Sequence, residues 1–421
     1  MKKAILLSSL AICINATTIT QLFDAIEKTA DYKLDNLANQ EMKINKKSVI
    51  NSLYPKVTLQ ASAEHFNRYN SMVPLTPTES GVLLKSGESI PFSQNIYRIG
   101  FEVSMPIFVK SIYDNKNRMT KLLKATKYQT KIELLKKQAF LVGYVSKLDY
   151  LFALKKSLLK QKSSITTTYK ALKVGVDVGR IPEFKLLRLE DSLNQINIQL
   201  SNIKKNIDET KANIYKLTNI KIDDFISFNS LIVDKGEFIS LKPLQEKVKA
   251  THYEIKSKQD NFYPKVMLSI KANRAYAKAY NTGDSIDEDF ASAGLYISWN
   301  IFDKKNGSDI QKAKINLIKN NLQIAKTKKD LEAEIDKIDS SLVEINKQIT
   351  LTKNSLKLKK ELLKGAKVAF RLNRMSVDEY LQYENDLAKT RADLASLIAN
   401  QNTLKANKAL IYGENLKKVF K

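Results

Sequence analysis

Alternation of apolar and polar residues with a period of two predicts four β-strands. The segments lie in two pairs, 57–64 with 97–105 and 266–273 with 291–301. Each runs for roughly ten residues, the length of a tilted strand that crosses a membrane. Aromatic residues sit toward the segment ends, as in the girdles of membrane barrels: Tyr54, Tyr97, Phe108, Tyr263, Trp299 and Phe302. A soluble sheet with one face on a core shows the same alternation, but the lengths and the aromatic ends favour a membrane sheet.

Elsewhere, apolar residues recur at alternating steps of three and four, the spacing of a coiled coil. The first half carries Ile132, Leu135, Ala139, Val142, Val145, Leu148 and Phe152, and the second half carries Ile335, Ile338, Leu342, Ile345, Ile349, Leu356, Leu363 and Phe370. Proline is absent from 107–181, 183–242 and 265–421, so these windows admit very long helices. A helix over 115–172 would be roughly 85 Å long. We predict two helical hairpins that turn at 174–182 and 370–376, with the apolar stripes used for packing.

The chain contains an internal duplication. The segment Tyr54–Val57 recurs as Tyr263–Val266, and further along Arg180 corresponds to Arg374. The register between the halves changes once, between the two strands of each half, which predicts a longer loop there in the first half. We therefore divide the mature chain into a first structural repeat, 17–241, with a helix, two barrel strands, a helical hairpin and a linker, and a second repeat, 242–421, with the same order of elements.

The N-terminus reads as a secretory signal peptide over residues 1–16. Lys2 and Lys3 precede an apolar run that ends at Ile14 and is followed by Ala16. The run is too short for a membrane anchor, which takes about 20 residues. A lipoprotein signal with lipid on Cys13, the only cysteine, is the alternative, and the bulky residue before Cys13 weakens it.

The charge, the histidines and the motifs of the sequence give no indication of catalysis, metal binding or nucleic-acid binding. The net charge is +26, but the lysines are scattered along the helical windows as a solvated face, so we expect no nucleic-acid partner. The two histidines, His65 and His252, are isolated, so we expect no metal site. We place an acidic loop between the third and fourth strands, with Asp284, Asp287, Glu288 and Asp289. Since no phosphate-binding loop or catalytic constellation is present, we expect no cofactor, no catalytic residue and no enzyme activity.

The signal peptide, the doubled strand-strand-helix-tip-helix unit and the tip sequence from Val178 to Glu183 together resemble the TolC family of outer-membrane efflux and secretion channels. The resemblance implies a mainly α-helical protein with membrane β-strands. Each protomer of a homotrimer would give four strands to a shared 12-stranded β-barrel in outer-membrane lipid. The long coiled-coil hairpins would form an α-barrel that extends into the periplasm.

The resemblance also implies a function. The chain would be the passive exit duct of a tripartite efflux pump or type I secretion system, docked by a periplasmic adaptor (membrane fusion protein) and fed by an inner-membrane pump or ABC transporter. A periplasmic coiled-coil scaffold or adaptor without a pore is the alternative.

The site residues that the resemblance implies lie at the two hairpin tips. Adaptor docking falls on Val178, Gly179, Arg180, Asn373 and Arg374, and the pore constriction falls on Glu379, Gln382 and Lys185. Gly179 and its counterpart Asn373 are both residue types that tolerate a left-handed backbone, which a tight tip needs. For Glu379 an exposed acid at the start of a helix, stabilised by the helix dipole, is the alternative.

Overall fold

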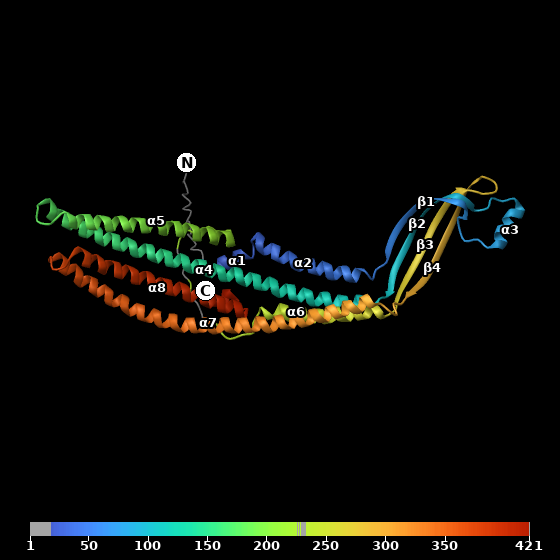
Figure 1. Cartoon of the computed structure of the whole chain (residues 1–421). Helices are drawn as coiled ribbons and strands as arrows, with labels where there is room; N and C mark the ends of the chain where they lie inside the picture. Colours follow the sequence, from blue (N-terminus) through green and yellow to red (C-terminus); the bar gives the residue numbers. More distant parts are fainter. Residues whose placement is uncertain (1–17, 225, 227, 229–232, 421) are drawn as a thin grey trace, which may run out of the picture. The chain divides into compact units, whose positions relative to one another are not determined.

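The computed structural model describes residues 18–224, 226, 228 and 233–420 (Figure 1). The predicted signal peptide at 1–16, with Cys13, therefore lies outside the described residues. The chain divides into two compact units. The helical unit comprises Met1–Ala38, Lys127–Pro243 and Ala325–Lys421, and the sheet unit comprises Asn39–Thr126 and Leu244–Ile324.

The sheet unit contains the four predicted strands, all antiparallel and in the order β1-β2-β3-β4. Their bounds are β1 Lys56–Ser71, β2 Phe92–Phe108, β3 Lys265–Lys278 and β4 Ser285–Ser298. Every strand is longer than its alternating segment, because ladder hydrogen bonds continue where the side-chain pattern fades.

Two predictions about β4 are wrong. The strand ends at Ser298, so Trp299 lies beyond it, where its indole N–H donates to the carbonyl of Phe262 at 2.8 Å. The acidic residues 287–289 lie within β4 and not in a loop. Arg274 on β3 pairs with Asp287 and, at 3.5 Å, with Asp289, and these cross-strand ion pairs stabilise an acidic segment in the ladder.

The connections between strands differ in length. Residues 279–284 join β3 to β4, whereas 72–91 join β1 to β2 and include a helix that the sequence analysis missed, α3 Pro77–Ser86. Thr76 and Glu79 form a capping box at its start, and Gly87 ends it with a left-handed φ of 74°. The predicted longer loop of the first half is thus confirmed. The capping box at the start of its helix is a pattern that can be recognised in the sequence.

The helices account for most of the chain. Their bounds are α1 Ile19–Ile26, α2 Ala30–Asn51, α4 Lys110–Asp177, α5 Phe184–Thr218, α6 Leu241–Gln259, α7 Lys304–Arg371, α8 Val377–Tyr412 and α9 Leu416–Val419, with a short 3-10 helix at Asp260–Phe262. The helices α4 and α7 have 68 residues each, about 100 Å at 1.5 Å per residue. The order helix, two strands, two long helices occurs twice, while the repeat boundary at 241/242 stays a prediction.

The core of the helical unit is built from the predicted apolar stripes. Every residue of the two stripes is buried or half-buried, and Val142, Val145 and Leu148 are fully buried. The helix α1 adds Ile19, Leu22, Phe23 and Ile26, and α9 adds Leu416 and Val419. The coiled-coil spacing therefore identified packing residues correctly.

Candidate functional site

The two hairpin tips have closely similar backbones. Residues 178–183 join α4 to α5, and 372–376 join α7 to α8. Gly179 has φ 72° and Asn373 has φ 55°, so the predicted left-handed conformation is confirmed at both. The next residue closes each turn: the Arg180 N–H donates to the Gly175 carbonyl at 2.8 Å, and the Arg374 N–H donates to the Ala369 carbonyl at 2.9 Å. These bonds satisfy the last helical carbonyls.

The residues assigned to adaptor docking are accessible. Val178, Gly179, Arg180, Asn373 and Arg374 are all exposed, and Val178 keeps 62% of its surface. The first tip therefore presents an apolar residue and a cation, Val178 and Arg180, and the second tip presents exposed Leu372 with Arg374. The assignment of docking itself stays a prediction.

The residues assigned to the pore constriction lie on the first turns of the returning helices. Lys185 is near the start of α5, and Glu379 and Gln382 are near the start of α8. The Glu379 carboxylate accepts from the Ser376 backbone N–H at 2.8 Å, while the Glu379 N–H donates to the Ser376 hydroxyl at 3.2 Å. Bonding to the Ser376 backbone and then to its side chain lowers the pKa of Glu379. This capping box fits the helix-start alternative for Glu379, and the pore role stays a prediction.

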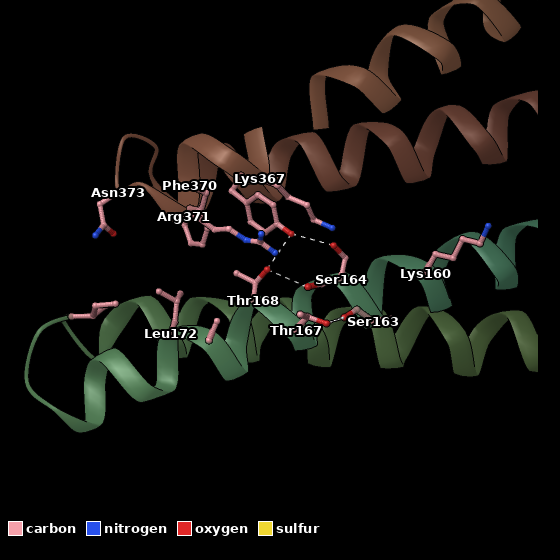
Figure 2. Close-up of a pocket in the computed structure, with 13 residues that line it drawn as sticks. Lys160, Ser163, Ser164, Thr167, Thr168, Leu172, Lys367, Phe370, Arg371 and Asn373 are labelled. Atoms are coloured by element: carbon pink, nitrogen blue, oxygen red, sulfur yellow. Dashed lines mark hydrogen bonds between the residues drawn. The ribbon is translucent and has the colours of Figure 1, made fainter. Parts of the chain in front are cut away.

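A polar network that the sequence analysis missed links the two hairpins near their tips, and Figure 2 shows its Ser164 and Thr168 side chains. Tyr380 on α8 is fully buried, and its hydroxyl donates to the Glu384 carboxylate at 2.8 Å. On α4, Thr168 donates to the Tyr380 hydroxyl at 3.2 Å and Ser164 donates to Glu384. We call Ser164, Thr168, Tyr380 and Glu384 the inter-hairpin network. Burial raises the pKa of Tyr380 to about 12, so the phenol stays a proton donor.

Further contacts extend this junction along α4 and α8. The ring of Tyr380 stacks on Phe370 with 4.8 Å between centroids. The Gln161 amide donates to the Asn385 side chain at 2.5 Å, and the Ser157 hydroxyl donates to the Ala388 carbonyl at 3.4 Å. Since buried hydrogen bonds are directional and costly to leave unmade, this seam fixes the register of one hairpin against the other.

The inter-hairpin network could have been suspected from the internal repeat. Glu384 corresponds to Glu190, one of the matches between the halves. Both accept a tyrosine hydroxyl, Glu190 from Tyr169 at 2.7 Å within the first hairpin and Glu384 from Tyr380. An acid retained in both halves of a duplicated helix indicates a specific partner, but the sequence does not say which.

Asp149 on α4 makes the stability of the helical unit depend on pH. Burial raises the pKa of its carboxyl to about 7, although a hydrogen bond from the Ile226 backbone lowers it in part. Because the folded pKa lies above the unfolded value of about 3.9, the folded state binds the proton more tightly. Stability therefore falls as pH rises from about 4 to 7 and levels off above that.

We expect Asp149→Asn to reduce this loss of stability. The thermal unfolding midpoint of the detergent-solubilised protein, measured at pH 5 and pH 8, should differ less in the variant than in the parent chain. Asp177→Asn, at the exposed end of the same helix, is the control and should leave the pH difference unchanged. An undiminished pH difference in Asp149→Asn would contradict the assignment.

The strand register separates the sheet unit into an apolar and a polar face. Leu59 pairs with Phe101, and Phe101 pairs with Ala272, so these residues share one face. The same face carries Val57, Ile99, Val103, Met105, Val266, Leu268, Ile270, Ala291, Ala293, Leu295 and Ile297. The ion-paired residues Arg274, Asp287 and Asp289 lie on this face at one end of the sheet. Leu59 and Ile297 are 74% and 71% exposed. A soluble sheet would bury such residues on a core, and here they face outward.

The opposite face is polar and internally bonded around Glu102, and at one end it holds a small buried cluster of Ile96, Ala275 and Ala277. Glu102 accepts from the Gln60 amide at 3.1 Å and from the Ser269 hydroxyl at 3.2 Å, and it lies 3.5 Å from the Lys271 ammonium. At the sheet edges, β1 pairs only with β2 and β4 only with β3 among the described strands. Each edge therefore presents backbone groups to which a further strand could bond.

The described residues hold neither a helix that could cross a bilayer nor a cluster of metal ligands. Over residues 18–224, 226, 228 and 233–420, no helix has the length and apolar character needed to cross a bilayer. The same described residues contain no group of three or more His, Cys, Asp or Glu side chains placed to hold a metal ion. His65 instead bonds through Nδ1 to the Asn95 side chain at 2.7 Å.

Comparison with known proteins places the fold. No protein-family model matches the sequence, and no curated protein matches it either. Among solved structures, the outer membrane protein VceC from Vibrio cholerae matches with a TM-score of 0.76 and 14% identity, over 94% of this chain and 96% of that one.

Two further structures agree. The CmeC outer membrane channel of Campylobacter jejuni gives a TM-score of 0.73 and 17% identity, over 94% of this chain and 85% of that one. The open state of the Neisseria gonorrhoeae MtrE outer membrane channel gives a TM-score of 0.74 and 13% identity, over 94% of this chain and 89% of that one. The chain therefore has the fold of these outer-membrane channels along nearly its whole length.

Proposed function

We propose that this chain is the outer-membrane channel of a tripartite efflux pump or type I secretion system. The observation that carries the proposal is the sheet with one exposed apolar face and one polar face. An apolar face toward lipid and a polar face toward a water-filled lumen are what a membrane barrel requires. The likeness of the fold to outer-membrane channels supports the same location, with the helical hairpins in the periplasm.

The barrel would be shared by three copies of the chain. Four strands are too few to close, since membrane barrels have at least about eight. The unpaired edges of β1 and β4 allow β1 of one copy to bond β4 of the next. Three copies then supply 12 strands. The hairpins of the three copies would continue as an α-barrel, built from two repeats per chain divided at 241/242.

The tips would be the point of assembly with the rest of the system. A periplasmic adaptor would contact Val178, Gly179, Arg180, Asn373 and Arg374, and an inner-membrane pump or ABC transporter would supply the energy. The chain itself would act as a passive duct without enzymatic chemistry. Its pore would be narrowest at Glu379, Gln382 and Lys185, and opening would require the inter-hairpin network to separate.

Single-channel recording in planar bilayers tests this function. The purified protein is expected to give discrete conductance steps, and a chain that gives none would be the scaffold without a pore. Glu379→Gln keeps a capping-box residue type and removes the charge. A cation about 4 Å from one carboxylate in water gains about 1 kcal/mol, so loss of a ring of three should lower the cation-to-anion permeability ratio about 5-fold or more.

Glu361→Gln is the matched control for this measurement. Glu361 is exposed on α7 and pairs with Lys364 at 2.9 Å, so its removal changes the same charge away from the returning helix. Equal permeability ratios in the two variants would mean that Glu379 does not line the pore, and the proposed channel function would still stand.

A further inference from the structure

A pocket of about 470 Å³ lies between the two hairpins beside the inter-hairpin network (Figure 2). Its wall comes from α4 on one side and from the end of α7 with the start of α8 on the other. This volume is within the range of pockets that bind small ligands, about 300 to 1,000 Å³. Of the tip and pore residues assigned above, Asn373 is among the described lining residues, and the three pore residues are not.

Cations from both hairpins line this pocket. Lys160 comes from α4, and Lys367 and Arg371 come from α7. None of the described lining residues is acidic. One buried acid, Glu384, lies 3.8 Å from the Lys367 ammonium and belongs to the inter-hairpin network. With that charge subtracted, the pocket retains an excess of positive charge.

Two of the cations are available to a ligand. Among the ion pairs of the described residues, none involves Lys160 or Arg371, whereas lysines elsewhere on α7 pair with acids, as Lys364 does with Glu361. In Figure 2 the Lys160 side chain extends away from Arg371 in the empty pocket. A multivalent anion between the two hairpins would attract both charges.

Hydroxyl groups complete the lining between the cations. Ser163, Ser164, Thr167 and Thr168 contribute them from α4. In Figure 2 the side chains of Lys367 and Arg371 lie across the pocket from Ser164 and Thr168. Three of these hydroxyl groups already donate: Ser164 to Glu384, Thr167 to the Ser163 carbonyl and Thr168 to Tyr380. The Ser163 hydroxyl, with the guanidinium and ammonium groups, can donate to carboxylate or phosphate oxygens.

We propose that this pocket binds a small multivalent oxyanion, a di- or tricarboxylate or a phosphate compound, which bridges Lys160 of the first hairpin to Lys367 and Arg371 of the second. A monovalent anion would satisfy one side only, so at least two charged groups are required. Because the ligand contacts both hairpins, it stabilises their packed arrangement. The inference concerns binding to the helical unit and goes beyond the proposed channel activity.

Isothermal titration calorimetry on the detergent-solubilised full-length protein tests the proposal. The probes are citrate, inorganic phosphate and acetate, each at constant ionic strength. We expect one citrate or phosphate per protomer and no saturable binding of acetate. Citrate stronger than phosphate identifies a carboxylate ligand, and the reverse order identifies a phosphate ligand. The preferred probe should also raise the thermal unfolding midpoint.

Charge-removing variants locate the binding in the pocket. Arg371→Gln and Lys160→Gln should each weaken the preferred probe by about 10-fold or more. Lys364→Gln, an exposed lysine of α7 outside the pocket lining, is the control and should bind as the parent chain does. The far-UV circular dichroism spectrum of each variant should be unchanged.

The proposal is overturned if neither citrate nor phosphate binds, or if acetate binds equally well. It is also overturned if Lys364→Gln weakens binding as much as Arg371→Gln, because the anion would then respond only to total charge. The measurement needs no pore, so a chain that binds citrate without conducting would retain this site and lose the proposed function.

Discussion

Replacing Leu59 by Arg is expected to prevent stable insertion of the sheet into a bilayer. Leu59 is 74% exposed on the apolar face, in the row that it shares with Phe101. An Arg on the lipid-facing side of a membrane barrel costs about 2 to 4 kcal/mol near the bilayer midplane. In a trimer the cost recurs in each copy, so the effect on the assembly is several-fold larger than on one chain.

The neighbouring residue supplies the control. Gln60 lies on the polar face, where its amide donates to Glu102, so Gln60→Arg places the same side chain beside an acid and toward the lumen. Folding into liposomes, followed by the shift in mobility of unheated samples on SDS gels, should be lost for Leu59→Arg and retained for Gln60→Arg. Equal insertion of the two variants would mean that the apolar face does not contact lipid.

The strands and long helices could be predicted from the sequence because each has a periodic contact with one environment. Leu59 and Gln60 alternate because the two sheet faces differ in polarity, and Val142 and Val145 follow the helical spacing because both enter the core. The β4 boundary could not be predicted, since an ion pair between Arg274 and Asp287 stabilises a segment that is polar in isolation.

The inter-hairpin network escaped prediction for a related reason. Ser164, Thr168 and Glu384 are the residue types of an exposed helical face, and nothing in their spacing shows that α4 packs against α8 at that point. The tips were more accessible to sequence reasoning because Gly179 and Asn373 carry a backbone constraint that their residue types reveal. The partner of a buried polar residue is a property of tertiary structure, and only the three-dimensional arrangement supplies it.

Replacing Tyr380 by Ala is expected to separate the hairpins at their tips. The change removes a fully buried ring from its stack on Phe370 and one of the donors to Glu384, a carboxylate that is only 4% exposed. Truncating a buried aromatic residue costs about 3 to 5 kcal/mol, and the weakly solvated acid adds to this. We therefore expect a lower thermal unfolding midpoint and a larger single-channel conductance.

Tyr380→Phe separates the hydrogen bond from the packing. It keeps the ring and removes the hydroxyl, so the loss is about 1 to 3 kcal/mol with a smaller rise in conductance. The matched control is Tyr169→Phe, which removes a hydroxyl bonded to Glu190 within the first hairpin and should leave conductance unchanged. Both changes delete one tyrosine-glutamate bond within a hairpin, but only Tyr380→Phe also removes the hydroxyl that accepts from Thr168, which is the bond between the hairpins. If Tyr169→Phe raised conductance as much as Tyr380→Phe, the bond between hairpins would have no special part in holding the tips closed.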